Sequence, residues 1–313
     1  MSMPLTLEEL QDIQSTAMAD DVEIELAKMT LWTAEQATEF FESGGTKEPT
    51  AAAGVVTDIS DTTAAASAPD AAEPPLPALG RKPRVALLHG TASNEKVFTM
   101  QMSSLLHRLK EDGVECYVVE GGEKVLESNA QLASVKSFFG DEHTYLEYTP
   151  VEPDSRGWKA YPGLDKAVGH IEARLAEKGG ADVLIGFSQG ANLASCVVAR
   201  AELGLEGVQP RDAAYRGVVL LSVNEPGWIA QRPAWFARSL RTPCLIGSAE
   251  GDTVAKTGPD VVSECFAPNR VRRHHHSGPG HRPLPRQKDE LVAMAEVVRA
   301  FVKEVCAAGG GRS

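Results

Sequence analysis

The sequence lacks the features that mark several common classes of protein. Its five cysteines are odd in number and have no CxxC spacing, so neither a disulfide framework nor a cysteine zinc site is predicted. No stretch approaches the ~20 apolar residues of a membrane-spanning helix, and the amino terminus has neither a basic start nor an apolar core. Reduced thiols and the absence of a leader predict a cytoplasmic protein without a membrane span.

Basic residues are also in deficit. The chain has 31 lysines and arginines against 43 acidic residues, a formal net charge of -12. Such a surface repels polyanions, so we expect no nucleic-acid partner and favour small-molecule substrates. With 313 residues, the chain is long enough to bury a substantial core around a catalytic cleft.

The first 80 residues differ in composition from the rest. Residues 1–45 contain two capping-box spacings, Thr6 with Glu9 and Thr33 with Gln36, which predict a small helical module. So small a module buries little area, so its aromatic residues are expected to dock on the main domain, on a second copy or on a partner protein. Residues 46–80 are rich in Ala and Pro and predict a linker, and residues 308–313 predict a flexible tail.

Residues 81–307 alternate between strand-like and helix-like segments. Several strands are continuous Val/Ile/Leu runs, which is typical of a parallel sheet covered by helices on both faces. A doubly wound, mostly parallel α/β domain is predicted. The expected strands are residues 84–88, 115–119, 182–185, 217–221, 243–247 and 270–276, and the expected helices are residues 97–110, 163–178, 189–201, 259–266 and 288–306.

Residues 121–157 interrupt this alternation with weak elements of mixed polarity. A connection of this length in a compact domain is usually a lid, an insertion or a partly mobile loop. We expect it to form a wall of the substrate site.

One pentapeptide carries a chemical signal. Gly186-Phe187-Ser188-Gln189-Gly190 matches GxSxG and lies between a predicted strand and a predicted helix. The sharp turn strains the backbone at the serine, and it needs small residues two positions before and two positions after to let strand and helix approach. Ser188 is therefore the candidate nucleophile.

A serine hydroxyl needs a histidine to take its proton and a carboxylate to orient that histidine. In α/β-hydrolases these groups follow the nucleophile in the order acid, then base, on loops after later strands. Asp252 and His281 occur in this order, each just beyond a predicted strand. Glu250 lies on the same loop as Asp252 and is the alternative acid.

The same logic predicts an oxyanion hole made of backbone N–H groups. One donor is Gln189, the residue after the nucleophile, and the other is Thr91 in the loop His89-Gly90-Thr91 after the first strand. No metal site is expected, because neighbouring residues of the run His274 to His276 point to opposite faces of a strand.

With these residues in place, the domain resembles the FSH family of serine hydrolases, which are small α/β-hydrolases. The resemblance spans residues 84–285, and the carrying segments are RVALLHGTASNEKVF, RGWKAYPGLDKAV, DVLIGFSQGANLA, GVVLLSVNEPGWI, TPCLIGSAEGDTV and HHHSGPGHRPLP. It implies a sheet of the α/β-hydrolase type, here with a small helical N-terminal extension. It also implies a Ser188, Asp252, His281 triad, ester hydrolysis and no cofactor. Val223 stands where the family has a glycine.

We therefore expect a serine hydrolase that cleaves carboxylic esters of small to medium acyl groups through an acyl-enzyme. The candidate substrate contacts are His89, Gly90, Phe187 and Trp158. Three alternatives remain open: a thioesterase, a low-turnover ligand-binding or receptor protein on the same fold, and a lyase using the same triad.

Overall fold

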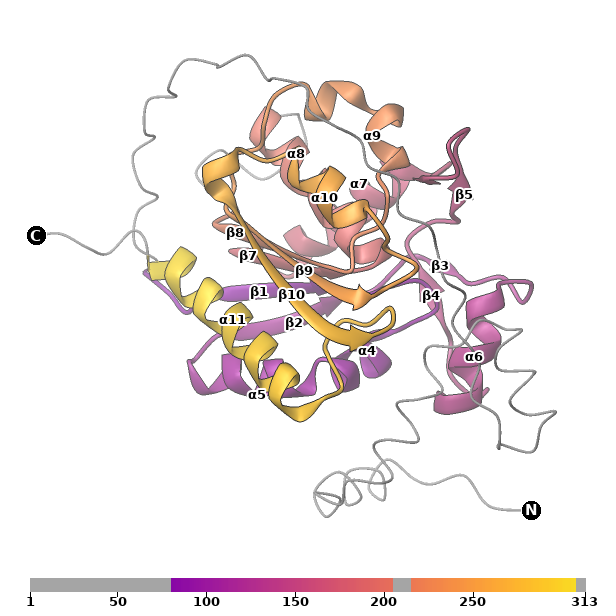
Figure 1. The fold of residues 1–313 in the computed structure, drawn as a ribbon, viewed down its shortest axis with the longest axis horizontal. Coiled ribbons are helices and arrows are strands. Elements are labelled where there is room, and N and C mark those ends of the chain that lie inside the picture. Colours follow the sequence, from indigo (N-terminus) through magenta and orange to yellow (C-terminus); the bar gives the residue numbers. More distant parts are fainter. Residues whose placement is uncertain (1–79, 205–214, 308–313) are drawn as a thin grey trace, which may run out of the picture.

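Six parallel strands form the central sheet of this computed structural model, which describes residues 80–204 and 215–307. The strands lie in the order β10-β9-β8-β7-β1-β2, so the chain runs from β1 outward to β2 and then continues on the other side of β1 (Figure 1). Their bounds are β1 (Arg84–Leu88), β2 (Glu115–Val119), β7 (Val183–Phe187), β8 (Gly217–Leu221), β9 (Cys244–Gly251) and β10 (Val271–Pro279). The change of direction between β1 and β7 is the topological switch point at which doubly wound sheets place their sites.

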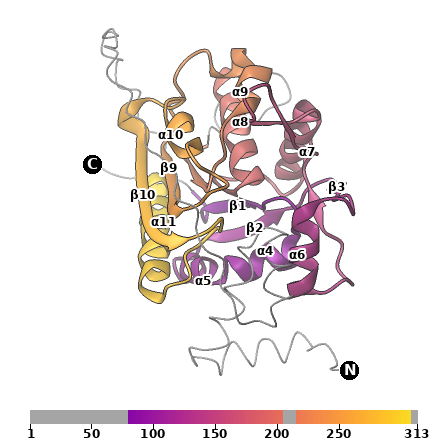
Figure 2. The same cartoon turned by 45° about the vertical axis from the view of Figure 1, so that its right-hand side comes forward.

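Helices cover both faces of the sheet (Figures 1 and 2). Alternate residues of each strand enter opposite cores: Leu184 and Leu220 face one core, and Ile185 and Val219 face the other. The first face carries α7 (Leu164–Glu177), α8 (Gln189–Leu203), α9 (Gly227–Gln231), η2 (Pro233–Phe236) and α10 (Gly258–Ser263). The second carries α4 (Glu95–Gln101), α5 (Ser103–Glu111) and α11 (Lys288–Ala307). This is the doubly wound α/β-hydrolase architecture that the sequence predicts.

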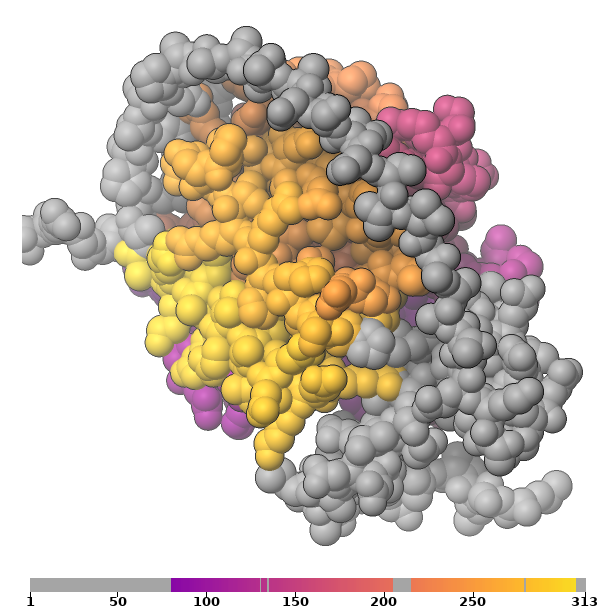
Figure 3. Space-filling view, in the orientation of Figure 1, coloured from indigo at the N-terminus to yellow at the C-terminus, as the bar shows by residue number. Residues whose placement is uncertain are grey.

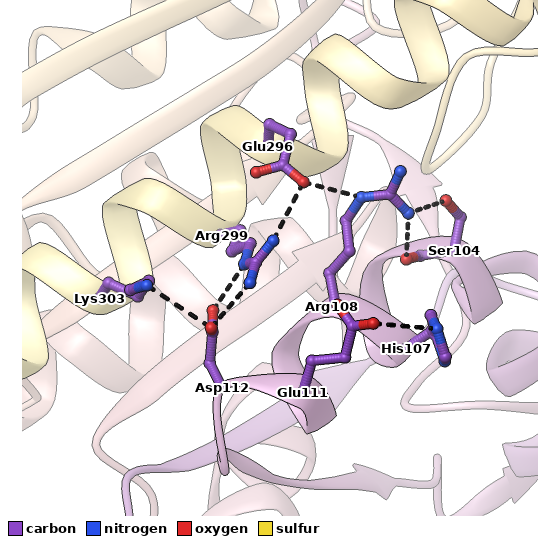
Figure 4. A network of polar contacts seen from close by, with 8 residues as sticks. All are labelled: Ser104, His107, Arg108, Glu111, Asp112, Glu296, Arg299 and Lys303. Atoms are coloured by element: carbon purple, nitrogen blue, oxygen red, sulfur yellow. Dashed lines mark hydrogen bonds and ion pairs between the residues drawn. The ribbon is translucent and has the colours of Figure 1, made fainter.

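An ion-pair network joins α5 to α11, although the two helices are far apart in sequence (Figure 4). The Arg299 guanidinium donates to both oxygens of Asp112, at 2.6 and 2.8 Å, and Arg108 donates to Glu296 at 2.9 Å. Hydrogen bonds from Arg299 lower the pKa of Asp112 to about 2. The network therefore holds α11 against the end of α5 on one face of the sheet.

The edge strand β10 is protected by charge. Arg272 pairs with Glu304 of α11, and Arg273 pairs with Asp260 of α10, so both arginines are held by flanking helices. β10 and α11 form much of the face seen in Figure 3. Charged side chains on an edge strand discourage pairing with another sheet, and here they also fix the strand that leads to the His281 loop.

The segment after β2 forms an insertion of short strands and one helix. It contains β3 (Glu123–Lys124), α6 (Ala130–Phe139) and β4 (Leu146–Glu147), followed by the β5–β6 hairpin (Glu152–Pro153 and Lys159–Ala160). Val125, Leu132 and Tyr145 form a small apolar cluster with Ala92 of the loop after β1 and Val97 of α4. The insertion is thus packed against the switch point.

Most predicted elements are confirmed, and the differences have local causes. β1, β2 and β8 begin and end at the expected residues. The single helix expected at residues 97–110 is wrong, because Met102 ends α4 and begins α5. Helices α6 and α9 were not anticipated, since each is short and its pattern is weak. The predicted N-terminal module, linker and tail lie outside the described residues.

Within the two described ranges, no helix has the length and apolar character needed to span a bilayer.

Candidate active site

Ser188 occupies a strained turn between β7 and α8. Its φ of 51° and ψ of −117° lie in a region that non-glycine residues rarely adopt. The two flanking glycines make this turn possible: a Cβ on Gly186 would lie 2.4 Å from the Gly190 oxygen, and a Cβ on Gly190 would lie 2.2 Å from the Leu88 oxygen. The backbone therefore presents Ser188 at the carboxyl end of the sheet, with the N-terminus of α8 directly behind it.

The structure brings Ser188, His281 and Asp252 into one hydrogen-bonded chain. His281 Nε2 lies 2.7 Å from Ser188 Oγ, and His281 Nδ1 lies 3.0 Å from both carboxylate oxygens of Asp252. The three residues come from the loops after β7, β10 and β9. These strands are separated in sequence, but because they are parallel their carboxyl ends lie on the same side of the sheet. With Nδ1–H donating to the carboxylate, Nε2 is left free to accept the serine proton.

Asp252 is held as a buried, ionised carboxylate. Its Oδ1 accepts hydrogen bonds from the backbone N–H groups of Val254 and Ala255, at 3.0 and 2.9 Å. Burial opposes ionisation, but the hydrogen bond from His281, its charge and the Ala255 N–H outweigh it, and the pKa of Asp252 is lowered. Glu250, the alternative acid, is exposed on β9, and the carboxylate that reaches His281 is that of Asp252.

The loop after β1 lies directly against the nucleophile turn. A Cβ on Gly90 would come within 3.0 Å of the Phe187 ring and 3.3 Å of Ser188 Cβ, so only glycine fits this approach without displacement. Two residues later Ala92 adopts a φ of 58°, a left-handed bend that turns the chain back toward α4. The Gln189 N–H is the first of α8 and has no intrahelical acceptor, and Thr91 is half-buried beside Gly90.

His89 supports this loop from beneath. It has no exposed surface, its Nδ1 lies 2.7 Å from the Gly90 oxygen, and its Nε2 accepts the Gly121 N–H at 2.9 Å. Burial lowers the pKa of His89 to about 4, so the ring is neutral and carries its proton on Nδ1. Both ring nitrogens are thus engaged with backbone, and His89 ties the loop after β1 to the loop after β2.

Phe187 and Trp158, two candidate substrate contacts, occupy different environments. Phe187 is largely buried and lies between His281, at 5.0 Å between ring centroids, and Phe98, at 6.4 Å. It therefore forms part of the floor beneath the imidazole. Trp158 lies in the β5–β6 hairpin, where the Arg156 guanidinium covers its ring at 4.0 Å. The structure packs Trp158 within that hairpin and supplies no contact that joins it to the triad.

The Gln189 side chain performs a task that the sequence did not suggest. Its Oε1 accepts the Tyr148 N–H at 2.9 Å, and its Nε2 donates to the Thr149 oxygen at 2.7 Å. Just before these residues, Leu146 exchanges backbone hydrogen bonds with Ser93, at 2.7 and 3.2 Å. The stretch 146–149 therefore bridges the nucleophile turn and the loop after β1. No sequence motif signals this contact, because the partners are backbone atoms.

In the part of the chain that the structure describes, no group of three His, Cys, Asp or Glu side chains could hold a metal ion, and this includes the histidine run of β10. His275 is exposed and lies 3.0 Å from Ser248 Oγ, while His276 is buried.

Sequence comparison relates the chain to serine hydrolases and esterases. A family model described as serine hydrolase (FSH1) matches residues 79–294, well over half of the chain. The esterase FPY3 of Fusarium mangiferae is 33% identical over 119 residues, which cover 38% of this chain and 49% of the relative. The esterase citA of Monascus ruber is 29% identical over 149 residues, which cover 46% and 56% of the two chains. The chain thus spans about half the length of the curated relatives it matches.

Among solved structures, esterase PE8 aligns with a TM-score of 0.48 at 19% identity and covers 74% of this chain and 97% of its own. Acyl-protein thioesterase 2 of Zea mays aligns with a TM-score of 0.47 at 19% identity, covering 72% and 96%. The family match spans β1 through the first turns of α11 and includes the turn at Ser188 and both partner loops. This chain belongs to the serine hydrolase (FSH1) family.

Proposed function

We propose that the protein is a serine hydrolase that cleaves carboxylic esters of small to medium acyl groups through an acyl-enzyme. The observation that carries the proposal is the continuous chain from Ser188 Oγ through His281 to the Asp252 carboxylate. Family membership supports it independently. No cofactor takes part in the proposed reaction, and a small-molecule ester or thioester is the proposed partner.

In the first half of the reaction, His281 Nε2 accepts the Ser188 proton as Oγ forms a bond to the acyl carbon. The 2.7 Å distance between Nε2 and Oγ, a normal hydrogen-bond length, supports this transfer. The carbonyl becomes a tetrahedral oxyanion, and the imidazolium that forms is stabilised by the buried Asp252 carboxylate. The imidazolium then gives its proton to the departing alcohol oxygen as the carbon–oxygen bond breaks, which leaves an ester on Ser188.

In the second half, water replaces the alcohol. His281 takes a proton from the water while the water oxygen attacks the acyl carbon. The resulting imidazolium then gives its proton to Ser188 Oγ as the bond from Oγ to the acyl carbon breaks and the acid leaves. Each half of the reaction returns His281 to its neutral form, and the second half restores the Ser188 hydroxyl. His281 therefore alternates between base and acid twice in each turnover.

The backbone N–H groups of Gln189 and Thr91 are the proposed donors to the oxyanion. Gln189 supplies the N–H at the positive end of α8. A Cβ on Gly90 would lie 3.3 Å from Ser188 Cβ, and this close approach supports a position for Thr91 beside the nucleophile. Such a donor is typically worth about 3 to 4 kcal/mol of transition-state stabilisation. Neither depends on a side chain, so the hole is a property of the backbone.

Of the proposed substrate contacts, Gly90 and Phe187 have the strongest support, because both adjoin Ser188 or His281. His89 is better described as a support of the oxyanion loop, since its two nitrogens are already paired. Trp158 remains a proposal for a more distant wall of the site. All five cysteines are free, which keeps a cytoplasmic location as part of the proposal.

The test uses a fluorophosphonate probe, which reacts only with an activated serine. We expect the wild-type chain to be labelled and Ser188→Ala to be unlabelled, with mass spectrometry locating the adduct on the peptide that contains Ser188. Ser195→Ala is a matched control, because Ser195 lies on α8 with its hydroxyl bonded to the Asn192 oxygen. Labelling that survives in Ser188→Ala contradicts the proposal.

Substrate class is tested with p-nitrophenyl esters and acyl-CoA thioesters of graded acyl length. Trapping an acylated Ser188 by mass spectrometry after rapid acid quench separates hydrolysis from a lyase reaction, in which no acyl-enzyme forms. Stoichiometric ligand retention without turnover would instead indicate a binding protein.

A further inference from the structure

The carboxyl end of β8 contacts all three triad-bearing segments. The Leu221 oxygen accepts the Ser188 N–H at 3.0 Å, and the Ser222 N–H donates to the Gly247 oxygen of β9 at 2.9 Å. Asn224 Nδ2 donates to the Val254 oxygen, two residues after Asp252, at 3.2 Å. Hydrogen bonds to backbone oxygens therefore connect the end of β8 to the nucleophile turn and to the acid loop.

Ser222 adds the connection to the base loop. Ser222 is buried, with 2% of the residue exposed, and its Oγ donates to the oxygen of Arg282, the residue after His281, at 3.2 Å. The hydroxyl therefore ties the end of β8 to the loop that carries His281. The same side chain also contributes, as a minor cause, to lowering the pKa of Asp252.

The backbone at Ser222 is strained. Its φ of 49° lies in the left-handed region, which glycine adopts readily and serine rarely adopts. Strain of this kind persists only where surrounding contacts hold it, and it gathers at functional sites. The N–H bond to Gly247 and the Oγ bond to Arg282 are the contacts that hold it here.

We infer that Ser222 is a positioning residue of the active site, whose hydroxyl holds the His281 loop in register with Ser188. The inference rests on the proposed hydrolase function and adds a fourth side chain to it. Ser222 contacts no reacting atom and acts through Arg282 of the His281 loop.

Two substitutions separate the hydroxyl from the strain. Ser222→Ala removes the hydroxyl and keeps a Cβ at a positive φ, while Ser222→Gly removes the hydroxyl and relieves the backbone. Ser222→Gly is therefore expected to melt at or above the wild-type temperature, so any loss of activity in it cannot be attributed to unfolding. Ser195→Ala, which deletes another buried hydroxyl bonded to a backbone oxygen, is the control.

The experiment measures kcat and KM for a p-nitrophenyl ester, together with melting temperatures, on the full chain. In both Ser222 variants we expect kcat to fall about tenfold with KM little changed, short of the ~100-fold loss that a 1 Å misplacement of a reacting group can cause. Ser195→Ala should keep the wild-type kcat and KM.

The outcomes separate this inference from the proposed function. If the wild-type chain hydrolyses the ester and Ser188→Ala does not, the function stands. A wild-type kcat in Ser222→Gly would then overturn the role of Ser222 alone. If instead the wild-type chain is inactive and unlabelled, the proposed function itself fails.

Discussion

Replacing Gly190 with alanine tests whether the nucleophile turn depends on the close approach of α8 to β1. Helix propensity alone predicts a gain of about 1 kcal/mol for glycine to alanine inside a helix. The structure predicts the opposite, because the new Cβ would lie 2.2 Å from the Leu88 oxygen, 2.5 Å from the Leu88 carbonyl carbon and 2.6 Å from the His89 oxygen. All three are backbone atoms of β1 or of the residue that follows it, and they cannot rotate away.

The magnitude follows from the geometry. Real Cβ atoms do not approach other heavy atoms closer than 3.0 Å, so α8 and β1 would have to separate by about 0.8 Å, the difference between 3.0 and 2.2 Å. Overpacking of this kind costs about 1–3 kcal/mol or more, which exceeds the gain in propensity. The separation also moves Ser188 and the Gln189 N–H away from the loop after β1, so an activity loss of 100-fold or more is expected.

Gly169→Ala is the matched control. Gly169 also lies within a helix, α7, and nothing lies within 4 Å of the position its Cβ would take. It should therefore show the propensity gain of about 1 kcal/mol and unchanged activity. Urea denaturation gives the free energy of unfolding of each variant, and the rate of fluorophosphonate labelling reports on the turn. If Gly190→Ala is as stable and as reactive as Gly169→Ala, the close approach does not position the nucleophile.

Three further predictions use the titratable groups. Asp252→Asn should slow fluorophosphonate labelling about 10³- to 10⁴-fold, because an amide facing His281 favours the wrong tautomer, and NMR of the ring nitrogens would show that change. His89, with a pKa of about 4, should keep its proton on Nδ1 from pH 5 to 8 in ¹⁵N spectra. Between pH 6.5 and 4 the unfolded chain protonates this histidine and the folded chain does not, so the free energy of unfolding should fall as pH drops through that range. Glu147 is buried opposite Glu123 in the β3–β4 pair; burial first and that charge second raise its pKa to about 7. Its ionisation destabilises the fold as pH rises from about 4.5 to 7, so Glu147→Gln should stabilise by about 1–2 kcal/mol at pH 8 and little at pH 4.5 by urea titration.

The sequence predicts the sheet well because its signal is local. Unalternated apolar runs such as RVALL and GVVLL are long enough to identify β1 and β8 without tertiary information. The GxSxG turn is equally local, since glycine at 186 and 190 satisfies a steric demand within five residues. The order of Asp252 and His281 then follows from topology, because the ends of parallel strands converge on one edge.

Other features depend on contacts that no local pattern encodes. Glu250 and Asp252 are nearly adjacent in sequence, and the choice between them depends on where the chain leaves β9 and on the N–H groups of Val254 and Ala255. Met102 interrupts a helical pattern without proline or glycine, so the break between α4 and α5 has no sequence mark. The insertion is similar, because α6 is fixed by its packing on Ala92 and Val97 rather than by its own periodicity.

Backbone strain ties the fold to the chemistry. In the described part of the chain, the non-glycine residues with positive φ are Ala92, Ser188, Ser222 and Lys256. They follow β1, β7, β8 and β9, and Lys256 donates its N–H to the Asp252 oxygen. Each such residue costs about 1–3 kcal/mol, a large share of the 5–15 kcal/mol that stabilises a typical domain. Strain at one edge of one sheet is what a rigid site requires, because relaxed loops would not hold Ser188, His281 and Asp252 within hydrogen-bond distance. Glycine substitutions that relieve this strain should therefore raise stability while they lower activity. Where a substitution raises stability and leaves activity unchanged, the strain at that residue does not position the site.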